Sequence, residues 1–221
     1  MLCFDPNHGH RVPGFNYQGA DKLGREFYEM CQKSNPDFLM VGEGCYDLQS
    51  QYYGTYTRAD YWHEPVLRYI DPTVPIACAV IDHNDLNHVN MCLADRYAMS
   101  YEVRNFKGHL GEFPRVMAYG RKVDNLRRRY ADFLWNGEFL DVLGATVKGD
   151  NIRYTVFRNL KNGKKAVVVY NVDTKKANTA SISIDGSSAP LVMASPEKPA
   201  PAKFTGAVTL GPQSAVVIME K

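Results

Sequence analysis

The sequence predicts an α/β region over residues 1–143 followed by an all-β antiparallel domain over residues 144–221. In the first region, short apolar runs alternate with stretches of helical period. After Gly144 the sequence pattern changes. Apolar and polar residues now alternate within short segments, which are separated by turns such as Asn162-Gly163 and Asp185-Gly186. These two patterns predict two domains that meet at residues 143 and 144.

Three apolar runs of the α/β region end in a carboxylate. Each run has the pattern of a buried strand that stops abruptly and presents an acid at its tip. The strands and their acids are residues 2–4 with Asp5, residues 38–41 with Glu43, and residues 76–81 with Asp82.

Helical periodicity separates and follows these strands. The predicted helices cover residues 19–34, 87–98 and 116–134, and residues 99–104 predict a weaker fourth strand. This order gives about four βα units. A closed eight-stranded barrel takes about 250 residues, so residues 1–143 are too few to close one and are predicted to form a partial (β/α) barrel. A partial barrel exposes sheet edges, so we expect self-association or completion by a missing N-terminal half barrel.

The all-β domain is predicted as a compact antiparallel sandwich. Its alternating segments are residues 152–157, 166–170, 180–184, 191–193, 204–210 and 215–218. The proline-rich stretch 196–201 is predicted as a loop within this domain.

Composition and charge exclude several partners. The chain has 221 residues, a formal net charge of +2 and no acidic or basic tail. The run Arg127-Arg128-Arg129 is predicted to be a solvated helix face, so we expect no nucleic-acid partner. No apolar run approaches membrane-spanning length, so no membrane partner is expected. The first residues have the pattern of the second half of a strand, so we expect further sequence before Met1. A targeting signal would lie in that sequence, and the localisation of the protein therefore stays open.

The strand-end acids indicate the chemistry. Barrel and open-sheet enzymes place catalytic groups at the carboxyl ends of their strands, where a rigid scaffold holds them. Hydrolysis of a glycosidic bond needs two carboxyl groups, one that donates a proton and one that acts as nucleophile or activates water. Glu43, Asp5 and Asp82 are therefore the candidate catalytic residues, and no metal or cofactor is expected.

An aromatic segment follows Glu43. Residues 46–62 mix tyrosines and a tryptophan with amide and hydroxyl side chains, a composition that suits sugar rings and equally suits a loop packed on its own domain. Tyr46 and Trp62 are candidate substrate-binding residues. His8 and His10, in the loop after Asp5, are candidates as hydrogen-bonding partners of the same substrate.

The strand ending in Asp5, the later Val41-Gly42-Glu43, the segment Asp82-His83-Asn84-Asp85 and the closing stretch 210–218 resemble one family. This order is similar to the C-terminal half of (β/α)8-barrel glycoside hydrolases of the α-amylase and α-galactosidase kind, with their C-terminal β-sandwich.

The resemblance implies roles for individual residues. Asp5 would be the nucleophile and Glu43 the general acid/base, while His83 and Asp85 would lie in the segment that binds substrate hydroxyls. Two features depart from the family pattern. Cys3 stands where an arginine supports the nucleophile, and the later motif reads Asp-His-Asn-Asp.

Two alternative functions follow from other features. Asp82, His83, Asp85 and His88 carry carboxylate and imidazole ligands, so a metal-dependent hydrolase is one alternative. The plainer interpretation is a capping Asp or Asn with helix-facing histidines, His88 in particular. The incomplete barrel and Cys3 support the other alternative, a non-catalytic carbohydrate-binding or remnant protein.

Overall fold

A computed structural model describes residues 2–4, 13–43, 55–57, 68–69, 72, 75–81, 85–101 and 108–221. The chain forms two compact units, Met1–Ala79 and Val80–Lys221. The predicted domain boundary at residues 143 and 144 lies inside the second unit and stays a prediction.

The first unit contains a three-stranded parallel sheet. Strands β1 (Leu2–Phe4), β2 (Met40–Glu43) and β3 (Thr55–Thr57) pair in that order, with β2 in the middle. Helix α1 (Pro13–Ser34) connects β1 to β2 in a βαβ unit, the connection that parallel neighbours require. Strand β4 (Ala77–Ala79) lies within the predicted strand 76–81.

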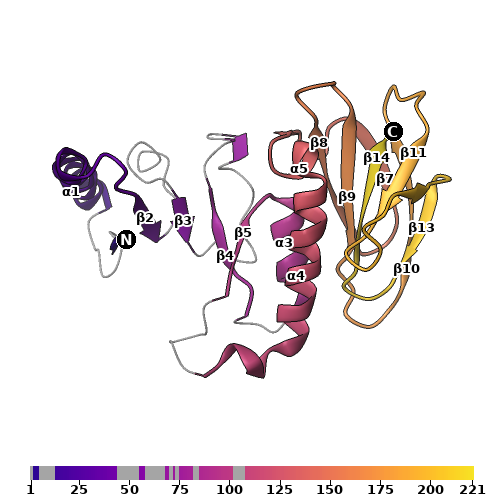
Figure 1. Ribbon diagram of the computed structural model, residues 1–221, viewed down its shortest axis with the longest axis horizontal. Helices are drawn as coiled ribbons and strands as arrows, with labels where there is room; N and C mark the ends of the chain where they lie inside the picture. Colours follow the sequence, from indigo (N-terminus) through magenta and orange to yellow (C-terminus); the bar gives the residue numbers. More distant parts are fainter. Residues whose placement is uncertain are drawn as a thin grey trace. The chain divides into compact units, whose positions relative to one another are not determined.

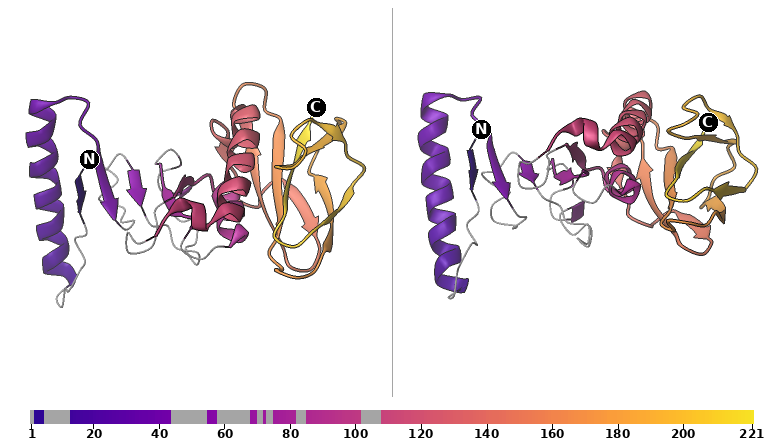
Figure 2. Two further views of the ribbon diagram at one scale, coloured as in Figure 1. Left: turned by 60° about the horizontal axis from the view of Figure 1, so that its bottom comes forward. Right: turned by 90° about the horizontal axis from the view of Figure 1, so that it is seen from below.

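Helix α1 begins at Pro13, six residues before the predicted start, because proline is well tolerated in the first helical turn. It ends at Ser34, before Asn35-Pro36, as predicted. Figure 2 shows α1 beside β1 and β2. Gln32 Nε2 donates to the Phe38 carbonyl at 2.9 Å, which ties the end of the helix to the approach to β2.

Strand β3 was not predicted. It lies inside the aromatic segment 46–62, where no strand period holds over the whole stretch. Its sequence Thr-Tyr-Thr consists of residues that favour strands, and pairing with β2 fixes it as one. Three residues are too few for a periodicity argument to detect.

The second unit begins with a helical part. Helix α3 (Leu86–Ala94) is shorter than predicted and is followed by β5 (Ala98–Ser100), which falls at the predicted weak fourth strand. A 3₁₀ turn, η3 (Leu110–Glu112), precedes α4 (Pro114–Arg129) and α5 (Ala131–Leu134). The predicted helix 116–134 is thus interrupted at Tyr130.

The rest of the second unit is a β-domain of two antiparallel sheets, as predicted. One sheet has the order β13-β10-β7 and the other the order β12-β11-β14-β9-β8-β6 (Figure 1). The strands are β6 (Glu138–Phe139), β7 (Ala145–Lys148), β8 (Ile152–Arg158), β9 (Lys165–Asn171), β10 (Asn178–Ile184), β11 (Leu191–Ala194), β12 (Ala202–Lys203), β13 (Ala207–Leu210) and β14 (Ala215–Glu220).

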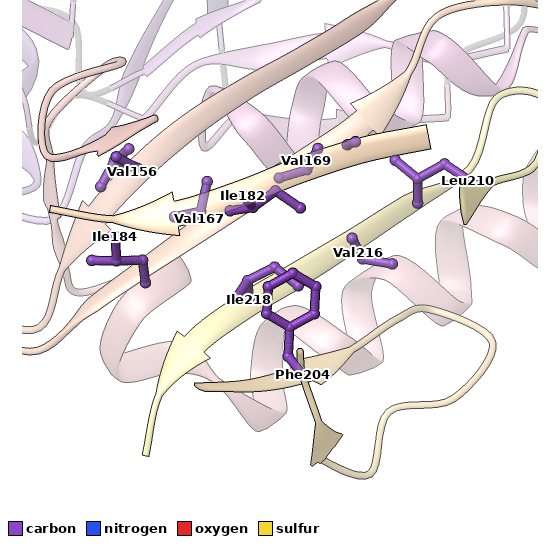
Figure 3. Packing of buried hydrophobic residues seen from close by; sticks show 11 residues of the cluster. Val156, Val167, Val169, Ile182, Ile184, Phe204, Leu210, Val216 and Ile218 are labelled. Carbon is purple, nitrogen blue, oxygen red and sulfur yellow. The ribbon is translucent and has the colours of Figure 1, made fainter. Parts of the chain in front are cut away.

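An apolar core lies between the two sheets of the β-domain. Ile182 and Ile184 of β10 face Val167, Val169 and Ile218 of the larger sheet in Figure 3. Every second residue of β10 from Ala180 to Ile184 is buried and the residues between them are exposed, the period of two that the sequence predicts for a half-buried strand.

One prediction about charge is wrong. Arg127 has no exposed surface, whereas its neighbours Arg128 and Arg129 are exposed. Its guanidinium donates to the carbonyls of Cys92 and Tyr97, near the end of α3. Only part of the arginine run is therefore a solvated face.

No helix among the described residues combines the length and the apolar character needed to cross a bilayer.

Candidate functional site

Glu43 is the last residue of β2, the central strand of the parallel sheet. On one side, Phe4 of β1 pairs with Gly42; on the other, Thr57 of β3 pairs with Glu43 itself. The parallel register therefore brings the carboxyl ends of three strands together, and Glu43 lies at that edge, as the sequence predicts.

Most of the other predicted site residues lie outside the described part of the chain. These are Asp5, His8, His10, Tyr46, Trp62, Asp82 and His83. Their predicted roles in catalysis and substrate binding remain predictions.

Asp85 is described, and it caps a helix. Its backbone is extended, with φ −115° and ψ 123°, and its Oδ1 accepts the Asn87 backbone N–H at 2.9 Å. The same oxygen accepts a hydrogen bond from Gln213 Nε2, a residue of the β-domain. This is the capping role that the plainer interpretation of the segment anticipates.

Gln213 connects the β-domain to helices α3 and α4 of the second unit. Besides the bond to Asp85, its Oε1 accepts from Arg115 of α4 at 2.9 Å, and its backbone carbonyl accepts from Asn90 of α3 at 3.0 Å. Its backbone N–H donates to the carbonyl of Asp173 at 3.0 Å. Only 5% of Gln213 is exposed, so water contributes little to satisfying these groups.

Further buried hydrogen bonds continue this polar contact between α3 and its surroundings. Tyr119 donates its phenol hydrogen to Asn90 Oδ1 at 2.7 Å, and burial raises the pKa of Tyr119 far above its ordinary value, so the phenol keeps that hydrogen. Asn87 Nδ2 donates to the carbonyl of Val172, and Thr155 Oγ1 donates to that of Ala94. Helix α3 is thus held to the β-domain through polar groups at both of its ends.

Sequence reasoning missed this network. Two asparagines in a short apolar helix, Asn87 and Asn90, were the available signal, because a buried amide requires partners. Nothing in the local sequence indicates that the partner of Asp85 and Asn90 is Gln213, more than 120 residues away.

A cavity of about 620 Å³ lies in the second unit between the end of β5, one face of α4 and Trp135. Its lining is mostly apolar, including Met99 and Met117, and its charged lining residues include Arg121, Asp124 and Arg127. Asp85, the predicted site residue that the structure describes in this unit, does not line this cavity.

The metal alternative is not tested by the structure. Among the described residues, no group of three or more His, Cys, Asp and Glu side chains is placed to hold an ion. Asp82 and His83, two of the four proposed ligands, fall outside that search.

Comparison with solved structures finds glycoside hydrolases. A maltogenic α-amylase, AmyB from Thermotoga neapolitana, superposes with a TM-score of 0.59 at 9% identity, over 88% of this chain and 58% of the amylase. Amy13B of Eubacterium rectale gives a TM-score of 0.45 at 13% identity, over 86% of this chain and 54% of that one. A family 44 xyloglucanase of Paenibacillus polymyxa gives 0.36 at 15% identity, over 70% and 34%.

The chain has a glycoside hydrolase-like fold. At 9% identity the similarity to the Thermotoga amylase shows the fold alone, and the chain spans 58% of that protein's length. No protein-family model matches the sequence, and no curated protein matches it.

Proposed function

We propose that this protein is a glycoside hydrolase that cleaves glycosidic bonds by paired-carboxylate chemistry, with Glu43 as general acid/base and Asp5 as its partner. The observation that carries the proposal is the parallel register of β1 and β2. Phe4 pairs with Gly42, and the next residues in the sequence are Asp5 and Glu43.

The register supports a close pair of acids. If it continues by one residue, Asp5 stands opposite Glu43, and residues in register on adjacent parallel strands project to the same face. Adjacent strands lie about 4.8 Å apart. This spacing favours the roughly 5–5.5 Å carboxyl separation of retaining enzymes over the roughly 6.5–9.5 Å of inverting ones. Asp5 would then be the nucleophile.

The fold supports the same proposal. A parallel sheet in which α1 joins β1 to β2 and β2 ends at Glu43, with an antiparallel sandwich later in the chain, is compatible with part of a (β/α) barrel and its C-terminal domain. A carbohydrate substrate follows from the chemistry, and Tyr46 and Trp62 of the aromatic segment supply rings on which sugar faces can stack. Asp82 would complete the site from a third strand.

The test is hydrolysis of a panel of α- and β-aryl glycosides by the full-length protein that the gene encodes, with the anomeric form of the first-formed product followed by NMR. We expect turnover with retained configuration that is unchanged by EDTA. Loss of turnover on chelation, restored by a divalent metal, would instead support the metal-dependent hydrolase. Saturable oligosaccharide binding without turnover would instead support the non-catalytic carbohydrate-binding protein.

A further inference from the structure

The turn between β13 and β14 carries an unexpected residue. Gly211 accepts the backbone N–H of Ser214 at 3.3 Å, Pro212 is the second residue of the turn, and Gln213 is the third, with φ 50°. A β-turn with proline second and a positive φ third strongly favours glycine or asparagine at the third position, because a side chain is strained there. The local turn therefore does not account for glutamine at position 213.

The contacts of the glutamine amide account for its identity. The arginine side chain of Arg115 can only donate, and the carboxylate of Asp85 can only accept, so the amide oxygen of Gln213 must face the first and the amide nitrogen the second. Glycine or asparagine would satisfy the turn, but neither carries an amide at this distance from the backbone. The side chain thus joins the β-domain to the start of α3 and, through Arg115, to α4.

Asp85 links the Gln213 contact to the candidate site, because it lies close to predicted site residues in the sequence. It follows Asp82 and His83 in the sequence by three and two residues, and its backbone marks the point where α3 begins. Its Oδ1 is shared between the Asn87 N–H and Gln213 Nε2, so the direction of the side chain is set by both partners. With either partner removed, the cap can rotate and the first turn of α3 can fray.

We infer that Gln213 is a positioning residue, by which the β13–β14 turn of the β-domain holds Asp85 and so fixes the start of α3 immediately after the predicted site residues Asp82 and His83. The functional part of this inference rests on the proposed glycoside hydrolase activity. The structural part, the hold on the start of α3, does not.

Amide hydrogen exchange of the full-length protein tests the structural part. Gln213→Ala is expected to speed exchange at the Asn87 amide by at least about tenfold, with exchange in β9 and β14 unchanged. Gln213→Glu keeps the size and the acceptor for Arg115 but cannot donate to Asp85 when ionised, so it should give the same local loss in a protein that remains folded. The matched control is Ser214→Ala, since the Ser214 hydroxyl donates within the turn itself, to the carbonyl of Gly211 at 2.9 Å.

Equal exchange at Asn87 in the wild type, Gln213→Glu and Ser214→Ala would overturn the inference, as would acceleration spread evenly over β9 and β14.

Activity gives a second readout. With a glycoside that the wild type turns over, Gln213→Glu should lower kcat several-fold while Ser214→Ala does not, and an unchanged kcat in Gln213→Glu would refute positioning of the site. Absence of turnover in the wild type would count against the proposed function alone, because the exchange result stands without it.

Discussion

The guanidinium of Arg127 stacks on the ring of Trp135, with its central carbon 4.3 Å from the ring centroid. Burial lowers the pKa of this arginine, yet the side chain keeps its charge because a guanidinium ordinarily stays protonated far above neutral pH. Its donors bind the carbonyls of Cys92, in the last turn of α3, and of Tyr97, just after that helix. Arg127 therefore acts as a buried link between α3, α4 and the residue after α5.

Arg127→Ala should lower the free energy of unfolding by about 3 kcal/mol, because the carbonyls of Cys92 and Tyr97 each lose a hydrogen bond from the guanidinium and a large volume is emptied. Urea denaturation measures the change. The neighbouring Arg128→Ala is the matched control, since Arg128 is exposed and pairs only at the surface with Asp124, a contact worth well under about 1 kcal/mol. Equal effects of the two substitutions would contradict the buried role of Arg127.

Gly120→Ala should also destabilise the protein, by about 1–2 kcal/mol, although alanine normally favours a helix over glycine. A Cβ at position 120 would overlap the hydroxyl oxygen of Tyr101 and approach its ring at 3.2 Å. Thermal unfolding measures the loss, and adding Tyr101→Phe should recover most of it. Gly19→Ala in α1 is the control, because no atom of the described residues lies within 4 Å of the new methyl group, and it should be neutral or stabilising.

Asp85→Ala should cost about 1 kcal/mol of stability, the usual effect of removing a helix N-cap, whereas Asp85→Asn should cost less because asparagine also caps helices. Chemical denaturation of the two variants checks the order. If alanine and asparagine were equally destabilising, the negative charge rather than the hydrogen bond to Asn87 would be responsible.

Asp173 predicts a pH dependence of stability. The backbone N–H groups of Lys175 and Lys176 donate to its Oδ1 at 2.8 and 2.9 Å and hold the pKa of this carboxyl below its ordinary value of 3.8. A carboxyl whose pKa is lower in the folded state adds stability above the unfolded-state pKa, and this contribution is lost as the pH falls through the folded-state pKa.

The melting temperature of the wild type should therefore exceed that of Asp173→Asn by a constant amount from pH 7 to about pH 5, and the difference should shrink below about pH 4. A difference that stays constant down to pH 2 would show that ionised Asp173 contributes nothing through these bonds.

The sequence predicted those features that depend on local pattern. Alternation in β10 and the apolar runs before Glu43 and Asp82 depend on neighbours along the chain, so the antiparallel domain and the end of β2 could be expected. The breadth of the helical pattern in residues 116–134 concealed the break at Tyr130, because the apolar period continues across it.

Other features depend on contacts between distant residues. Arg127, Arg128 and Arg129 are chemically identical, and only the packing of α4 against α3 decides which of them is buried. The partners of Gln213 come from two helices that lie far back in the sequence, so a turn motif alone cannot reveal its role. The short strand β3 forms because β2 is beside it.

The central claim is that Glu43 serves as the general acid/base of a glycosidase, and the turnover of an aryl glycoside by full-length Glu43→Gln tests it most directly. Glu26→Gln on the exposed surface of α1 is the control. We expect kcat/KM for a substrate with a poor leaving group to fall by about 10²–10⁴-fold in Glu43→Gln and to be unchanged in Glu26→Gln. Wild-type turnover by a folded Glu43→Gln protein would contradict the account.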